Sequence, residues 1–190
     1  MKPSTTKTYT ASHRILHWSI ALSMTVLFIT GFLRMNWMGR KTIVKAIENG
    51  TRQELQLSKK QMGSIAKEVL EPMWQWHEYA AYLMFVLFIA RICYMVVRGI
   101  RFPRPFSKES SVKERLQGLS YIAFYLFTCM AIVTGFYLKW IDGDWSEQME
   151  TIHKWGIYWF PLFILLHFAG VLIDELYNRK GITSKMIGGD

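Results

Sequence analysis

The sequence contains few cysteines and none of the common catalytic fingerprints. Its two cysteines, Cys93 and Cys129, both lie inside strongly apolar segments, so we do not expect a structural disulfide. No C-x-x-C-H motif is present, which excludes covalently attached c-type haem. No catalytic triad, phosphate-binding loop or dinucleotide-binding fingerprint appears. The residues that carry function must therefore be sought elsewhere in the chain.

Acidic residues are scarce relative to basic ones. The chain has 14 aspartates and glutamates against 23 lysines and arginines, which gives a formal net charge of +9. The basic residues lie mostly between apolar stretches, where positive charge sets membrane orientation and meets anionic lipid. We therefore attribute the charge to contact with membrane lipid and expect no nucleic-acid partner.

Long apolar stretches are abundant. Four of them approach the roughly 20 residues that cross ~30 Å of hydrocarbon as a helix. Because they fill most of the chain, we expect one domain over residues 1–190, an all-α integral membrane protein built as a four-transmembrane-helix bundle. The first stretch is too long for a signal peptide and no cleavage pattern follows it, so we expect it to be retained. We find no convincing sequence repeat. The stretches lie at about 15–33, 75–97, 116–138 and 155–176.

The polar segment after the first stretch contains a helical pattern of its own. Ser58 and Gln61 form a capping box, and apolar residues then recur at helical spacing until Pro72. This pattern predicts a short amphipathic helix at about 59–70 that Pro72 ends. Such a helix fits a position on the membrane face or across one end of the bundle. A docking surface for a partner is the alternative.

Charge in the connecting segments predicts the orientation of the chain. The segment RGIRFPRPFSKESSVKER is densely basic, and the positive-inside rule places it in the cytoplasm together with the N- and C-termini. The segment KWIDGDWSEQME is acidic and falls outside, in agreement. The first polar segment also falls outside although it is rich in cations, which disagrees. Ser111 and Glu114 form a second capping box, which predicts the start of the third helix.

Four histidines lie in or beside the apolar stretches. His153 and His167 are fourteen residues apart, close to four helical turns, which would put both on one face roughly 21 Å apart along the axis. By depth in the membrane His77 pairs with His153, and His17 pairs with His167. Each pair could supply two axial imidazoles to one haem b held inside a four-helix bundle. Histidine is expensive in hydrocarbon, so its presence there indicates function.

Two glycines fit the same geometry. Gly31 lies fourteen residues after His17, on the same face at the depth of the outer pair. A glycine there would let a flat macrocycle approach the backbone, whereas the alternative is helix–helix packing through a small residue. Gly135 in the third stretch has the same two interpretations.

Cationic residues accompany the inner pair. Arg91 lies fourteen residues after His77, at the depth of the inner pair, where a haem propionate is a natural partner. The alternative is that its side chain extends to the cytoplasmic interface. His13 lies one turn before His17, and we expect it at the surface or in contact with a propionate rather than on iron.

These residues resemble those of the bacterial cytochrome b561 family and, more distantly, the cytochrome b subunits of nickel–iron hydrogenases. The resemblance implies two haems b (protohaem IX), a bacterial inner-membrane location, cytoplasmic termini and electron exchange with a quinone, ubiquinone or menaquinone. It covers essentially the whole chain. The residues that carry it are Arg14-x-x-His17-Trp18, His77, Arg91 with Arg98 and Pro103, Gly135, and the pair His153-x13-His167.

Three functions are compatible with these features. The first is a di-haem membrane cytochrome that carries electrons between the quinone pool and an outer-side donor or acceptor. That partner could be a periplasmic c-type cytochrome, a reductase or a hydrogenase subunit. The second is a superoxide oxidase, a superoxide:quinone oxidoreductase, in which cations of the first polar segment steer the anion. The third is a metal-ion transporter, which is disfavoured because the only acids near a span interior are Asp174 and Glu175.

Overall fold

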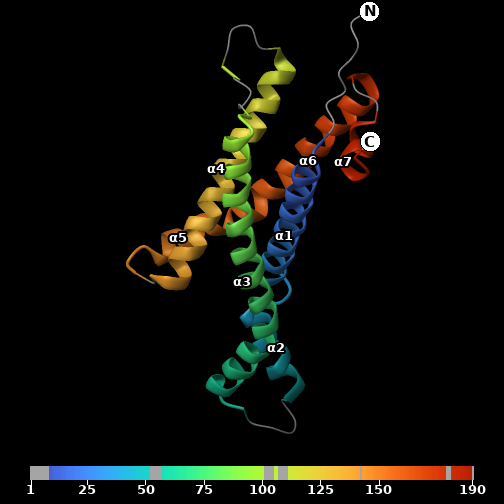
Figure 1. Cartoon of the computed structure of the whole chain (residues 1–190). Coiled ribbons are helices and arrows are strands. Elements are labelled where there is room, and N and C mark those ends of the chain that lie inside the picture. Colours follow the sequence, from blue (N-terminus) through green and yellow to red (C-terminus); the bar gives the residue numbers. More distant parts are fainter. Residues whose placement is uncertain are drawn as a thin grey trace, which may run out of the picture. The chain divides into compact units, whose positions relative to one another are not determined.

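The computed structural model describes residues 9–51, 57–100, 105–106, 111–141, 143–178 and 181–189. Every regular element in these ranges is helical, which confirms the all-α prediction (Figure 1). The elements are α1 (Ala11–Met35), α2 (Arg40–Thr51), α3 (Lys59–Val97), α4 (Val112–Trp140), α5 (Ser146–Lys154), α6 (Gly156–Ile173), the π-helix η1 (Asp174–Asn178) and α7 (Ile182–Ile187).

Four helical segments are long and apolar enough to cross a membrane. They are α1, α3, α4 and the segment Ser146–Tyr177. Many of their large apolar side chains are exposed, including Leu22, Val86, Leu126 and Leu165. Exposed apolar side chains in such number are typical of a surface that faces lipid rather than water. The helices thus agree with the four predicted spans, although α1, α3 and α4 extend beyond the apolar stretches.

The chain divides into two compact units, one formed by Leu22–Phe85 and the other by Met1–Ala21 with Val86–Asp190. We call them the small unit and the large unit. In the small unit the middle of α1 contacts the middle of α3, where the Ser23 hydroxyl donates to the Ala80 carbonyl at 3.0 Å. Ser23 and Met84 are buried. The small unit thus joins the span predicted first to the span predicted second.

The helix predicted at 59–70 does not end at Pro72. The capping contacts of Ser58 and Gln61 are present, but α3 continues through Pro72 as one helix of 39 residues. Proline removes one backbone donor and crowds the preceding turn. In a long helix the turns before and after the proline can keep the helical conformation, because the residues on both sides of Pro72 have helical periodicity. The prediction of a separate short helix was therefore wrong.

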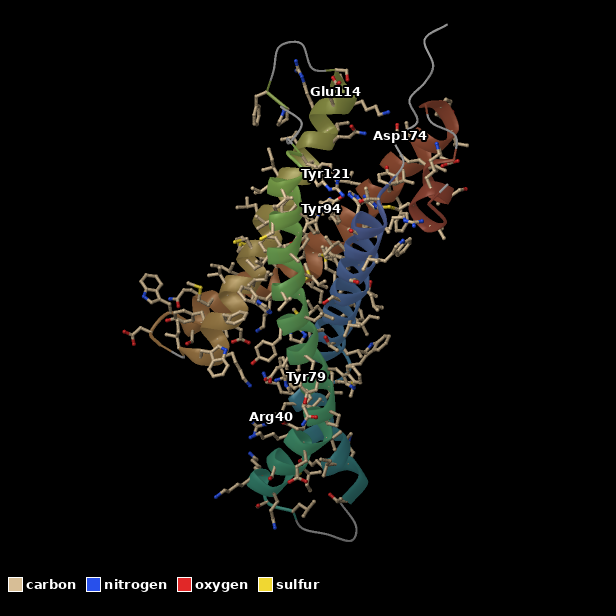
Figure 2. The ribbon with its side chains drawn as sticks, in the orientation of Figure 1. Arg40, Tyr79, Tyr94, Glu114, Tyr121 and Asp174 are labelled. Atoms are coloured by element: carbon tan, nitrogen blue, oxygen red, sulfur yellow. The ribbon has the colours of Figure 1, made fainter. Side chains whose placement is uncertain are left out.

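The sequence analysis also missed α2, which lies in the same polar segment. In the small unit α2 approaches the start of α3 at Gly63, where a β-carbon would lie 2.8 Å from a guanidinium nitrogen of Arg40. Figure 2 labels Arg40 near this end of α3. The buried Gly63 therefore permits the close approach of the Arg40 side chain.

In the large unit α4 packs against α5 and α6, and α7 packs against η1. The Ser111–Glu114 capping box at the start of α4 is present, as predicted. Lys113 donates to the buried carboxylate of Asp174, so the start of α4 is joined to η1. Figure 2 shows Glu114 in the first turn of α4 and Asp174 on η1.

The fourth span is not one straight helix. His153 lies on α5 and His167 on α6, and the break falls at Trp155 rather than at Pro161, which lies inside α6. Around the break the backbone tightens, since the Trp155 N–H donates to Ile152 at 3.1 Å, a bond between residues three apart. The expectation of four uninterrupted turns on one face therefore fails at this break.

Candidate functional site

His17 and His167 lie together in the large unit. Their ring centroids are 6.0 Å apart, with an angle of 38° between the ring planes. A metal–imidazole bond is about 2 Å long and the ring centre lies about 1 Å beyond the nitrogen, so two rings on opposite sides of one metal have centroids about 6 Å apart. The observed spacing fits two axial ligands of a single metal.

Aromatic side chains surround this inner pair. Phe163 stacks on His167 with centroids 5.9 Å apart, and Phe163 in turn contacts Phe124 of α4 at 5.2 Å. Trp18 meets the His17 ring edge-on at 5.5 Å. These aromatic rings make the surroundings of the two imidazoles apolar, so little water competes for the nitrogen atoms of the rings.

His153 is held on α5 by two acceptors from α4. Its Nδ1 lies 3.1 Å from the Ala131 carbonyl oxygen and 3.0 Å from Oγ1 of Thr134. A carbonyl oxygen only accepts, so Nδ1 carries the proton and donates it. The Nε2 atom is left with its lone pair, which is the form of imidazole that ligates a metal.

His77 is held in a similar way in the small unit. Its Nδ1 lies 2.8 Å from Oγ1 of Thr30, on α1. The ring also meets Trp74 edge-on at 5.6 Å, one turn earlier on α3. His77 belongs to the small unit and His153 to the large one, so the structure describes each histidine in its own surroundings.

The sequence analysis missed Thr30 and Thr134. Both are followed by glycine and phenylalanine, so the tripeptide Thr-Gly-Phe occurs at 30–32 and again at 134–136. A repeat of three residues is too short to stand out by periodicity in apolar helices. Comparison of the first and third spans with each other would have shown it.

The two glycines of these tripeptides differ in their surroundings. A β-carbon on Gly135 would lie 3.1 Å from Cε1 of His153, so this glycine makes room for the histidine ring. A β-carbon on Gly31 would meet no atom of the described residues within 4 Å. Among the described residues Gly31 therefore makes no close approach of the kind that Gly135 makes to His153.

Arg91 lies half-buried in the large unit with neutral partners. Its guanidinium donates to the Tyr125 hydroxyl and to Nδ1 of His13, each at 3.3 Å, and lies over the Tyr94 ring at 5.8 Å. The Tyr94 hydroxyl bonds Thr10 at 2.7 Å; Figure 2 shows Tyr94 on α3. Both hydrogen-bond partners of Arg91 in the described chain are neutral, so its charge is available to an anionic group.

The resemblance implies that Arg14 is one of the cofactor-binding residues, and in the structure its side chain lies against α7. One guanidinium nitrogen donates to the Ile187 carbonyl at 3.4 Å, and Trp18 donates to the Met186 carbonyl at 3.2 Å. These bonds join the start of α1 to α7 within the large unit. Arg14 therefore contacts the C-terminal helix rather than His17.

Clusters that suit an isolated metal ion are not found in the described parts of the chain. No group of three or more histidine, cysteine, aspartate or glutamate side chains lies close enough to hold one. A metal that is already held by a macrocycle needs only one or two imidazoles, because the macrocycle fills the other coordination positions.

The four apolar spans define a class of protein, a helical membrane protein that carries histidines on several of its helices. The comparisons narrow this class. The family model for prokaryotic cytochrome b561 matches residues 8–189, and the chain belongs to that family. A probable Ni/Fe-hydrogenase B-type cytochrome subunit of Bradyrhizobium diazoefficiens is 24% identical in an alignment that covers 96% of this chain and 84% of that protein.

No solved structure matches the chain. Membership of a b-type cytochrome family implies haem b, and the chain is a multi-pass membrane protein of electron transfer. The resemblance derived from the histidine pattern is thus confirmed at the level of the family. The chemistry of the described imidazoles fits this cofactor, since the inner pair has the spacing of two axial ligands.

The close approach at Gly135 gives a test of how His153 is held. The Gly135→Ala variant is expected to lose haem. Its added β-carbon would lie 3.1 Å from Cε1 of His153, which is too close, so the His153 ring would have to move. Overpacking costs about 1–3 kcal/mol, against about 1 kcal/mol gained in helix propensity. Haem content and thermal unfolding of the purified protein measure the two effects.

Gly170 on α6 provides the control for this variant. It is exposed, and a β-carbon there would meet no described atom within 4 Å. Gly170→Ala is expected to keep full haem content and to gain about 0.5–1 kcal/mol of stability. Equal haem content in both variants would show that Gly135 does not position His153.

Proposed function

We propose that the protein is a single-domain di-haem b cytochrome of the bacterial inner membrane, which carries electrons between the quinone pool and a partner on the outer side. The observation that carries this proposal is the 6.0 Å separation of the His17 and His167 rings. Two such histidines on different helices, inside an apolar environment, are suited to bis-imidazole ligation of one haem.

The inner haem would be ligated by His17 and His167. Arg91 and His13 lie within hydrogen-bond distance of each other in the same unit, and Arg91 has no anionic partner in the described chain. A guanidinium is the natural partner of a haem propionate, because it offers several donors in one plane. Arg14, on the same helix as His13, is a further cation at this end.

The outer haem would be ligated by His77 and His153. This pairing follows from the depths of the two residues in their spans. Its support lies in the matched surroundings of the two imidazoles, each of which has its Nδ1 bonded to a threonine. Gly31, beside Thr30, would let the macrocycle approach the backbone of α1.

The haem, when bound, supplies one-electron oxidation and reduction. The residues of this chain supply everything else. The histidines fix the iron ligands, the aromatic rings around His167 exclude water, and the charge of Arg91 stabilises the reduced state. A quinone needs two electrons and two protons to become a quinol, so the carrier must deliver its electrons in two successive steps.

The orientation is proposed from charge. By the positive-inside rule, the basic segment between the second and third spans faces the cytoplasm, and both termini then face the cytoplasm as well. The hydrogen bonds between the start of α1 and α7 support a common side for both ends of the described chain. The relative named as a hydrogenase subunit supports a hydrogenase subunit as partner. A reductase subunit or a periplasmic c-type cytochrome is the alternative partner.

Oxidation by quinone tests this function. Purified protein is reduced, reconstituted in liposomes and mixed with a short-chain ubiquinone or menaquinone while the haem spectrum is followed. We expect both haems to be oxidised rapidly and to come to equilibrium with the quinone. Full retention of the reduced spectrum with either quinone would contradict the proposal.

A second candidate function is oxidation of superoxide, and a charge feature of the small unit favours it. Residues 40–51 and 57–71 carry more cations than acids, and the cations are exposed. Such a surface attracts a small anion and raises its rate of encounter. Each superoxide that gives up one electron becomes dioxygen, and two of these electrons reduce one quinone. The cations are Arg40, Lys41, Lys45, Lys59, Lys60 and Lys67; the acids are Glu48, Glu68 and Glu71.

Stopped-flow mixing with superoxide separates the two candidates. Rapid haem reduction by superoxide that slows as salt rises supports the second function, because salt screens the attraction of the anion. No reduction by superoxide excludes it and leaves the exchange of electrons with a protein partner.

A further inference from the structure

The two histidines of the outer pair are held by matching hydrogen-bond arrangements. In the small unit Thr30 of α1 contacts Nδ1 of His77 at 2.8 Å. In the large unit Thr134 of α4 contacts Nδ1 of His153 at 3.0 Å. The two contacts come from different helices and different units, so they are independent observations of one arrangement.

The hydroxyl of each threonine already donates its proton to a backbone carbonyl of its own helix. Oγ1 of Thr30 lies 2.7 Å from the Val26 carbonyl and 3.1 Å from the Leu27 carbonyl. Oγ1 of Thr134 has the corresponding distances, 2.8 Å and 3.2 Å, to the carbonyls of Met130 and Ala131. A hydroxyl has one proton and two lone pairs, so each threonine accepts from the imidazole rather than donates to it.

The direction of these bonds decides which nitrogen of each imidazole is available. Since Oγ1 accepts, Nδ1 must be protonated in His77 and in His153. The Ala131 carbonyl, 3.1 Å from Nδ1 of His153, independently requires the same tautomer because a carbonyl cannot donate. Nε2 is then the unprotonated nitrogen in both rings, and the bond at Nδ1 constrains the rotation of each ring.

Burial strengthens this effect. Thr30 is 9% exposed and Thr134 is 3% exposed, so water does not replace the hydroxyl as the acceptor. A hydrogen bond in such surroundings is stronger than in water. An acceptor on Nδ1–H makes the imidazole more basic, which stabilises oxidised over reduced iron when the other nitrogen is a ligand.

We propose that Thr30 and Thr134 are positioning residues for the outer haem, each of which selects the tautomer and orientation of one axial histidine and lowers the reduction potential of that haem. This inference rests on the proposed function, in which His77 and His153 ligate the outer haem. The Thr-Gly-Phe tripeptide would then be the sequence signature of the arrangement in each half of the chain. It places the acceptor and a residue without a side chain in succession beside the ligand.

Valine tests this role, because it has nearly the shape of threonine without the hydroxyl. Thr30→Val and Thr134→Val are expected to raise one of two midpoint potentials in a redox titration. The component that rises should be the one that disappears in His77→Ala. In haem transfer to apomyoglobin, the corresponding phase should be about 10- to 100-fold faster.

Thr128 supplies a matched control on the same helix. It is 3% exposed, as Thr134 is, but its hydroxyl has no hydrogen-bond partner among the described residues. Thr128→Val is therefore expected to leave both potentials unchanged. Thr134→Ser, which keeps the hydroxyl, is expected to restore the wild-type potential, and it keeps the test valid if Thr134→Val does not fold.

The outcomes separate the inference from the proposed function. Unchanged potentials and transfer rates in both valine variants, with two haems retained, would overturn the role of the threonines and leave the di-haem proposal intact. A wild-type protein that binds no haem would overturn the proposed function, and this is measured without any threonine variant. A shift in the potential of the haem that survives in His77→Ala would contradict the assignment of the threonines to the outer haem.

Discussion

The His17→Ala variant is expected to hold one haem b per chain, against the two that we propose for the wild-type protein. The ring of His17 lies 6.0 Å from that of His167, and neither can ligate an iron from both sides alone. Without the His17 imidazole, the haem that His17 and His167 would hold keeps only one of its two protein ligands. Haem extracted from purified protein, divided by protein concentration, measures the result.

His13→Ala is the matched control, since His13 lies on the same helix one turn before His17. Its Nδ1 accepts from Arg91, so we place it near a propionate rather than on the iron. This variant is expected to keep two haems. If His13→Ala loses a haem and His17→Ala keeps both, the inner ligand on α1 has been misassigned.

Pairs of substitutions should reveal which histidines share a haem. We expect His77→Ala and His153→Ala each to leave one haem, and the double variant His77→Ala/His153→Ala also to leave one. The combination His77→Ala/His17→Ala, by contrast, should leave none, because it removes a ligand from each site. The two effects add only when the sites are independent.

The same measurement, haem per chain in each purified double variant, decides the pairing. A chain that keeps one haem after His77→Ala/His17→Ala would show that these two histidines serve the same site. Folding of each variant is checked by its helical circular dichroism, so that loss of haem is not confused with loss of the bundle.

The sequence alone was enough to identify the spans and the histidines. Apolar stretches of nearly twenty residues have few interpretations, and an imidazole within them needs a partner or a function. The depth of His17 and of His167 in their spans predicted that they would meet, and the structure brings their rings together. The family resemblance followed from the same residues.

What escaped prediction depends on local geometry or on neighbouring helices. Pro72 was expected to end a helix, but α3 passes through it. The fourth span breaks at Trp155, where a bond between residues three apart tightens the backbone, although Pro161 is the proline of this span and lies inside α6. The periodicity of apolar residues detects neither effect, because both depend on the backbone hydrogen bonds of a single helical turn.

The threonines illustrate a different limit. A threonine in an apolar helix usually bonds its own backbone, and Thr30 and Thr134 do so. Their second role appears only when another helix brings an imidazole to the remaining lone pair. Similarly, Arg91 was placed by spacing near the inner pair, but its bonds to His13 and Tyr125 required the packed structure.

A reduced-minus-oxidised spectrum with haem quantification on purified wild-type protein tests the central claim most directly. We expect two haems b per chain, with the sharp reduced band of bis-imidazole ligation in both. A stoichiometry of one haem per chain, or a spectrum without bis-imidazole character, would contradict it.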